Sequence, residues 1–169
     1  MRSPLTLTDV RIWNSVDEGY LEFADAIRIE AGQIVAVGAA DGLRQGAEAQ
    51  SCEGRTLLPG LIDAHVHLCL DPEIRNALDQ GKETPEALRA LMARRFDAMV
   101  RAGITTARDL GGGTWDELYV RDRIPAGEIP GPRLVCSGQP ITSVKGHYHF
   151  WGSEAETLDA ALHVLERQV

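Results

Sequence analysis

The 169-residue sequence lacks features that mark membrane, secreted and nucleic-acid-binding proteins. No apolar run is long enough to span a bilayer, and the first residues, MRSPLTLTDVRIW, contain no apolar core of a signal peptide. A formal net charge of -8 leaves no excess of positive charge for nucleic acid or an anionic membrane surface. We therefore expect no nucleic-acid partner and no membrane partner, and we interpret the acidity as a solvated surface.

Cysteine is also scarce. Cys52, Cys69 and Cys136 are odd in number, widely spaced and outside any C-x-x-C motif. This spacing favours thiols in a reducing compartment over a disulfide framework or a structural zinc site. The sequence therefore predicts a cytoplasmic protein.

The pattern of apolar residues changes near Pro59. Residues 5–58 are β-rich: residues 5–13 alternate, and two strand-like runs within 25–38 meet at a turn over 31–33. From residue 59, strand-like runs (61–68, 104–110 and 132–138) alternate with helix-like runs (84–103, 114–124 and 153–169). This alternation predicts an α/β fold with a parallel sheet.

The expected helices carry start signals of two kinds. Thr84 followed by Pro85 is typical of an N-cap and a first helical residue. Capping boxes predict that the next two helices begin at Thr114 and Ser153. The last run reaches Val169 with no glycine or proline to end it, and a closed eight-stranded barrel needs roughly 250 residues. We therefore expect an incomplete architecture.

The stretch LIDAHVHL carries the strongest chemical signal. If it is a strand, successive side chains alternate between faces, so Asp63, His65 and His67 share one face. Two imidazoles at this spacing can converge on one metal ion. Asp63 can orient one of these histidines without binding the metal itself. The alternative is a pair of half-buried histidines with ordinary hydrogen bonds.

These motifs together resemble the metal-dependent amidohydrolase superfamily. GRTLLPGLIDAHVHL resembles its first barrel strand, and GITTARDLGG resembles its second. RDRIPAGEIPGPRLVCSG followed by GHYHFWG resembles the branch of imidazolonepropionase-like and Xaa-Pro dipeptidase-like enzymes. The resemblance implies the N-terminal portion of such an enzyme: a small β-sandwich portion over 1–58, then the first three β/α units of a TIM-type (β/α)8 barrel over 59–169, incomplete.

The same resemblance implies chemistry. His65 and His67 would hold a divalent metal, most often zinc, in a centre that is binuclear in the complete enzyme. The bridging lysine, the other ligands and the general-base aspartate would lie beyond Val169, and Lys145 is no substitute because it follows the third strand. The implied function is hydrolysis of C–N bonds in amides, cyclic amides or dipeptides, with the 169-residue chain inactive alone. The alternative is a non-catalytic truncated chain or scaffold that needs a partner to complete the barrel.

Other candidates follow the second and third strands. His147 and His149 would line the substrate pocket, or else belong to an exposed loop. Arg108 and Asp109 would orient the site or line the pocket, or else form a buried structural pair. His163 is expected to be solvated. The unpaired sheet edges of an incomplete fold predict self-association as a homo-oligomer.

Overall fold

The structure is a computed structural model that describes residues 3–71, 73, 74, 76–80 and 83–168. The chain divides into two compact units, Met1–Pro59 and Gly60–Val169, which are described separately. Within the described residues, no helix combines the length and the apolarity needed to cross a membrane.

The first unit contains two small sheets. One sheet has the order β5-β4-β1-β6, from β1 (Leu5–Thr8), β4 (Ala26–Glu30), β5 (Gln33–Gly38) and β6 (Glu48–Ser51), with helix α1 (Ala40–Leu43) after β5. The other has the order β3-β2-β7, from β2 (Arg11–Asn14), β3 (Gly19–Tyr20) and β7 (Thr56–Leu57). A shared core of Val10, Ile12, Ala24 and Ile27 joins residues of both sheets.

Two local predictions for this unit have different outcomes. The turn over 31–33 is confirmed, because β4 and β5 pair antiparallel on either side of it. The continuous alternation over 5–13 is wrong, because Asp9 adopts a positive φ of 53° and separates β1 from β2. Each half of the run pairs within a different sheet.

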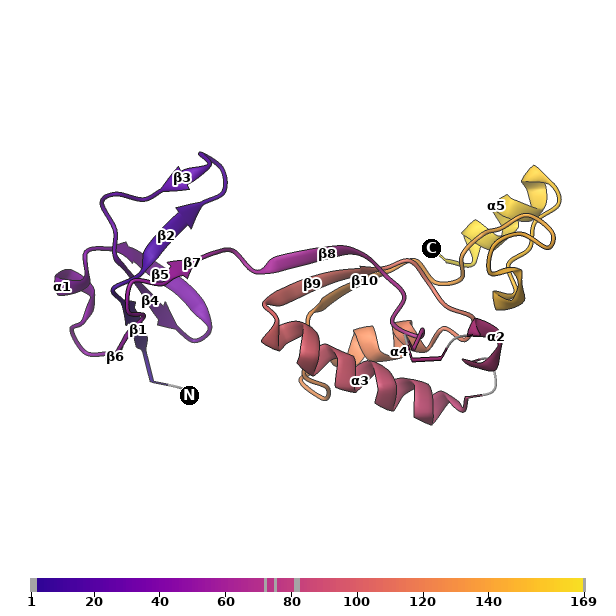
Figure 1. Cartoon of the computed structure of the whole chain (residues 1–169), viewed down its shortest axis with the longest axis horizontal. Helices are drawn as coiled ribbons and strands as arrows, with labels where there is room; N and C mark the ends of the chain where they lie inside the picture. The colour runs from indigo at the N-terminus through magenta and orange to yellow at the C-terminus, as the bar shows by residue number, and fades with distance from the viewer. Residues whose placement is uncertain (1–2, 72, 75, 81–82, 169) are drawn as a thin grey trace. The chain divides into compact units, whose positions relative to one another are not determined.

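The second unit is a mixed α/β structure around a parallel sheet. The sheet has the order β10-β9-β8, from β8 (Leu61–Val66), β9 (Ile104–Asp109) and β10 (Arg133–Cys136). The helices are α2 (Ala77–Gln80), α3 (Pro85–Arg101), α4 (Asp116–Arg123), the 3-10 helix η1 (His149–Trp151) and α5 (Leu158–Glu166). Figure 1 shows α3 and α4 along one face of this sheet.

The starts of α3, α4 and α5 depend on which group forms a hydrogen bond with the nearby Thr or Ser hydroxyl. Thr84 caps α3 as predicted, with its Oγ1 accepting a hydrogen bond from the Ala87 amide at 3.2 Å. The predicted starts at Thr114 and Ser153 are wrong. The Thr114 hydroxyl donates to the Asp116 carboxylate, and the Ser153 hydroxyl donates to Gln139, so α4 and α5 begin later.

The helix-side face of the sheet forms the core of this unit. Val66, Asp109 and Cys136 are paired in register across the three strands, so their side chains share this face. The core there consists of Leu68, Cys69, Met92, Phe96, Ala107, Val120, Leu134 and Trp151. The alternation expected from Asp63 to His67 is interrupted, because the pairing of β8 with β9 shifts register between Asp63 and Val66. Asp63 pairs with Ala107 and Val66 with Asp109, so the prediction that Asp63 shares one face with both histidines is wrong.

A candidate metal centre at the end of β8

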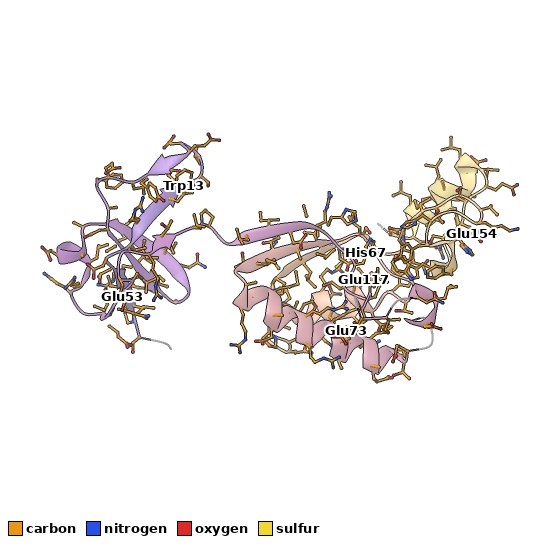
Figure 2. The ribbon with its side chains drawn as sticks, viewed as in Figure 1. Trp13, Glu53, His67, Glu73, Glu117 and Glu154 are labelled. Carbon is orange, nitrogen blue, oxygen red and sulfur yellow. The ribbon has the colours of Figure 1, made fainter. Side chains whose placement is uncertain are left out.

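His65 is the penultimate residue of β8, and His67, labelled in Figure 2, directly follows the last residue of the strand. Their ring centroids are 5.5 Å apart and their planes are inclined by 72°. Alternation along a strand predicts this proximity. His65 is exposed and His67 is partly buried, so the pair has one side open to solvent.

The orientation of His67 is fixed by its other ring nitrogen. Nδ1 lies 2.8 Å from the carbonyl oxygen of Gly111. A carbonyl only accepts hydrogen bonds, so Nδ1 must carry the proton and the neutral ring has a bare Nε2. A histidine with one nitrogen donating to a carbonyl and the other bare is in the form that ligates metals.

Asp63 contacts the backbone of the motif. Its Oδ1 accepts a hydrogen bond from the backbone amide of His65 at 3.2 Å. The carboxylate therefore orders the chain that carries His65, and this is a contact with the peptide rather than with the imidazole.

Arg108 and Asp109 do not form the buried pair that the sequence left open as one alternative, and that alternative is wrong. Adjacent strand residues point to opposite faces, which separates the two side chains. Arg108 is exposed and donates from Nε to the Ala64 carbonyl at 2.8 Å. Asp109 is 1 % exposed, and burial raises the pKa of its carboxyl group.

Aromatic rings of the loop before α5 surround His67. Tyr148 lies 6.2 Å and Trp151 5.4 Å from the His67 ring, and these two aromatic rings stack on each other at 4.2 Å. The predictions from sequence did not single out Tyr148 or Trp151. The run HYHFW is the signal that was available, because it concentrates rings in one short loop.

His147 and His149, the substrate-site candidates, are both exposed. The His147 ring packs edge-on against Tyr148, and His149 Nδ1 lies 3.7 Å from the Glu154 carboxylate. Within the described part of the chain, no ring contact joins either residue to His65 or His67. The loop thus brings Tyr148 rather than its two histidines to the pair.

A small pocket adjoins this loop, with a volume of about 160 Å³. It is lined by Cys69, Leu70, Leu88, Gly113, Thr114, Phe150 and Trp151. The lining is mostly apolar, and Trp151 belongs both to this pocket and to the surroundings of His67. The space suits an apolar group more than a charged one.

Glu117, in the first turn of α4, is a buried acid that sequence reasoning saw only as a capping residue. Its side chain is 1 % exposed, and neither carboxylate oxygen has a hydrogen-bond partner among the described residues. Burial first, and then the charges of Asp109 and Asp116, raise its pKa to about 7, while Arg121 offsets part of the rise. The group therefore stays protonated at pH values where an ordinary glutamate has lost its proton.

The residues present fit part of a metal site. His67 offers a bare nitrogen beside His65, whereas a catalytic zinc site has about three protein ligands. Among the residues that the structure describes, no group of three or more His, Cys, Asp or Glu side chains is placed to hold an ion. The pair thus matches two ligands of a larger set.

Comparison with known proteins finds relatives that are similar in sequence or in fold. Imidazolonepropionase of Mesorhizobium japonicum is 29% identical over 136 residues, which is 79% of this chain and 29% of that protein. A prolidase crystallised with N-methylphosphonate-L-proline has a TM-score of 0.74 and 25% identity, over 95% of this chain and 38% of that one. A Xaa-Pro dipeptidase with bound methionine has a TM-score of 0.73 and 21% identity, over 91% and 38% of the two chains.

These relatives confirm the branch that the motifs predicted, and the chain spans less than half the length of each. The model of the amidohydrolase family matches residues 56–168, which include β8, both histidines and the loop around His67. The chain belongs to the amidohydrolase family.

Proposed function

We propose that this chain is part of a metal-dependent hydrolase of C–N bonds, in which His65 and His67 are two of the metal ligands. The observation that carries the proposal is the hydrogen bond from His67 Nδ1 to the Gly111 carbonyl, beside a second imidazole 5.5 Å away. Family membership supplies the reaction class.

Zinc is the metal that this donor set favours, because neutral imidazole nitrogens suit it. Bound there, a divalent ion would act as a Lewis acid that polarises the scissile carbonyl and activates water. The chain's own residues prepare the ligands: Gly111 keeps the proton on Nδ1 of His67, and Asp63 orders the backbone of His65.

The rest of the site belongs, in this proposal, to structure outside the 169 residues. The support is that the chain covers 38% of the prolidase chain it resembles. We assign β8, β9 and β10 to the first three strands of a TIM-type barrel, residues 59–169, and residues 1–58 to part of a β-sandwich. The chain alone is then inactive. A cytoplasmic location follows from the cysteine pattern.

The substrate in this proposal is a small molecule or dipeptide with an apolar part. Tyr148, Trp151 and the adjoining pocket supply an apolar wall next to His67. His147 and His149 remain proposed contacts for the polar part, since both are exposed on the same loop. The relatives named imidazolonepropionase and prolidase are consistent with this class.

Titration of the chain with cobalt(II), followed by its visible absorbance, tests the ligand assignment. Binding should weaken strongly in His65→Ala and in His67→Ala. His163→Ala is the matched control, because His163 lies on α5 with its side chain 75% exposed. Equal binding by the wild type and the His65→Ala/His67→Ala double variant would refute the assignment.

A further inference from the structure

We infer that Asp109 is a positioning residue that holds His67 in its metal-binding orientation through two backbone amides. The inference deepens the proposed function and rests on it, because it concerns the same histidine. The contacts that carry it join the ends of β8 and β9.

The place of Asp109 follows from the sheet. It is the last residue of β9, the central strand, and it shares the helix-side face with Val66 and Cys136. Its carboxylate is therefore held under the end of β8 and out of solvent, at 1 % exposure. A carboxylate in this position cannot contact substrate, but it can organise the chain above it.

Each carboxylate oxygen of Asp109 has its own partner. Oδ2 accepts a hydrogen bond from the amide of Leu68 at 2.7 Å, and Oδ1 accepts one from the amide of Gly111 at 2.6 Å. Leu68 directly follows His67 in the chain. One side chain thus holds the peptide between His67 and Leu68 and the peptide that enters Gly111, the residue whose carbonyl faces the His67 ring.

The Gly111 contact leads on to the imidazole. The carbonyl of the same residue accepts the hydrogen bond from His67 Nδ1 at 2.8 Å. Gly111 has a φ of 102°, and a Cβ there would lie 1.9 Å from the Gly138 carbonyl oxygen, so only glycine fits. Glycine provides the close approach but no rigidity, and the Asp109 bond to its amide supplies that rigidity.

A purely structural role explains the arrangement less well. Burial of the Asp109 carboxylate, which is 1 % exposed, is costly. Among the described residues no ion pair neutralises it. A positioning role accounts for both amide partners. Leu68 directly follows His67 in the chain, and the carbonyl of Gly111 accepts the hydrogen bond from the His67 ring.

The tautomer of His67 provides the test, because it can be read without metal and without activity. Two-bond 1H–15N correlation spectra of the 15N-labelled chain near neutral pH should show wild-type His67 with protonated Nδ1 and bare Nε2. In Asp109→Asn, the single amide oxygen can accept from only one of the two backbone amides. The ratio of the two tautomers should then shift toward the Nε2-protonated form, on the order of tenfold.

Glu117→Gln is the matched control. It makes the same acid-to-amide change in the same core, but Glu117 has no hydrogen bond to the His67 backbone. Its His67 tautomer should match the wild type. If the spectrum shows that Asp109→Asn is unfolded, Asp109→Ser is measured in the same way. A shifted tautomer ratio in that variant supports the inference, and a wild-type ratio contradicts it.

The inference is overturned if wild-type His67 carries its proton on Nε2, or if a folded Asp109 variant keeps the wild-type tautomer ratio. Cobalt(II) binding is recorded on the same samples. A tautomer that depends on Asp109 in a chain that binds no metal would keep the positioning role and refute the metal function. Metal binding by a chain whose tautomer ratio is unchanged in the Asp109 variants would support the metal function and refute the positioning role.

Discussion

At the scale of single residues, Glu117 ties the stability of the second unit to pH. Its pKa is about 7 in the folded chain, against an ordinary value of 4.5. Between these values the folded state holds a proton that the unfolded state has released. The free energy of unfolding therefore falls as pH rises through this window, and changes little from this cause above it.

We expect this effect to be on the order of 3 kcal/mol at pH 8. Glu117→Gln cannot ionise, so its free energy of unfolding should lose this dependence and exceed the wild-type value most at pH 8. Urea denaturation at pH 5 and pH 8 measures the difference. The exposed residue Glu156 supplies the control, Glu156→Gln. Parallel pH dependence in wild type and Glu117→Gln would contradict the assignment.

Two of the thiols should be unreactive in the folded chain. Burial raises the pKa values of Cys69 and Cys136 to about 12. At pH 8 the thiolate fraction is then on the order of one in ten thousand, and the thiolate is the species that reacts. We expect iodoacetamide to modify these two cysteines only after urea unfolding. Peptide mapping by mass spectrometry would contradict this if native and unfolded chains were labelled equally fast.

At the scale of elements, α3 anchors the second unit through its buried face. Phe96 is 0% exposed and packs in the core with Met92. Phe96→Ala should lower the free energy of unfolding by about 3–5 kcal/mol, because it leaves a cavity. Val100→Ala, on an exposed position of the same helix, should cost less than about 1 kcal/mol. Equal denaturation midpoints for the two variants would contradict this role for α3.

The elements also show what the sequence could predict. The start of α3 was predictable because Thr84 caps it with a bond only three residues along the chain. The starts of α4 and α5 were missed because the Thr114 and Ser153 hydroxyls bond to side chains instead. A capping box indicates a local preference, and a stronger partner for the hydroxyl overrides it.

At the candidate site, too, contacts between residues close in sequence were predictable and contacts between distant residues were not. The proximity of His65 and His67 is local, since alternation along one strand sets it. The Gly111 carbonyl that fixes the His67 tautomer lies 44 residues away in sequence. The amide partners of Asp109 likewise depend on the pairing of β9 with β8. Such contacts follow only from the assembled sheet.

At the scale of the whole molecule, unpaired edges predict self-association. β5 is an edge strand of its sheet, and its side chains Ile34, Val35 and Val37 are exposed. Exposed apolar edge strands are sites of pairing between chains. We expect the apparent mass in size-exclusion chromatography to rise with concentration, and Val35→Lys to reduce this rise. A monomer at every concentration would contradict it.

Activity is the remaining property at this scale, and we expect the 169-residue chain with added zinc not to hydrolyse amides. His65 and His67 supply two ligands, and no further cluster of metal-binding side chains occurs among the described residues. The exposed position of His65 also leaves the site wet, which weakens electrostatic stabilisation of a transition state.

The measurement is an assay of the zinc-loaded chain against dipeptides and N-acyl amino acids, with His65→Ala as the matched control for contaminating hydrolases. The expected result is the same background rate for both chains. Turnover by the wild type that disappears in His65→Ala would contradict the prediction. It would then mean that a second copy of the chain supplies the missing ligands, which ties this assay to the self-association expected from the open edges.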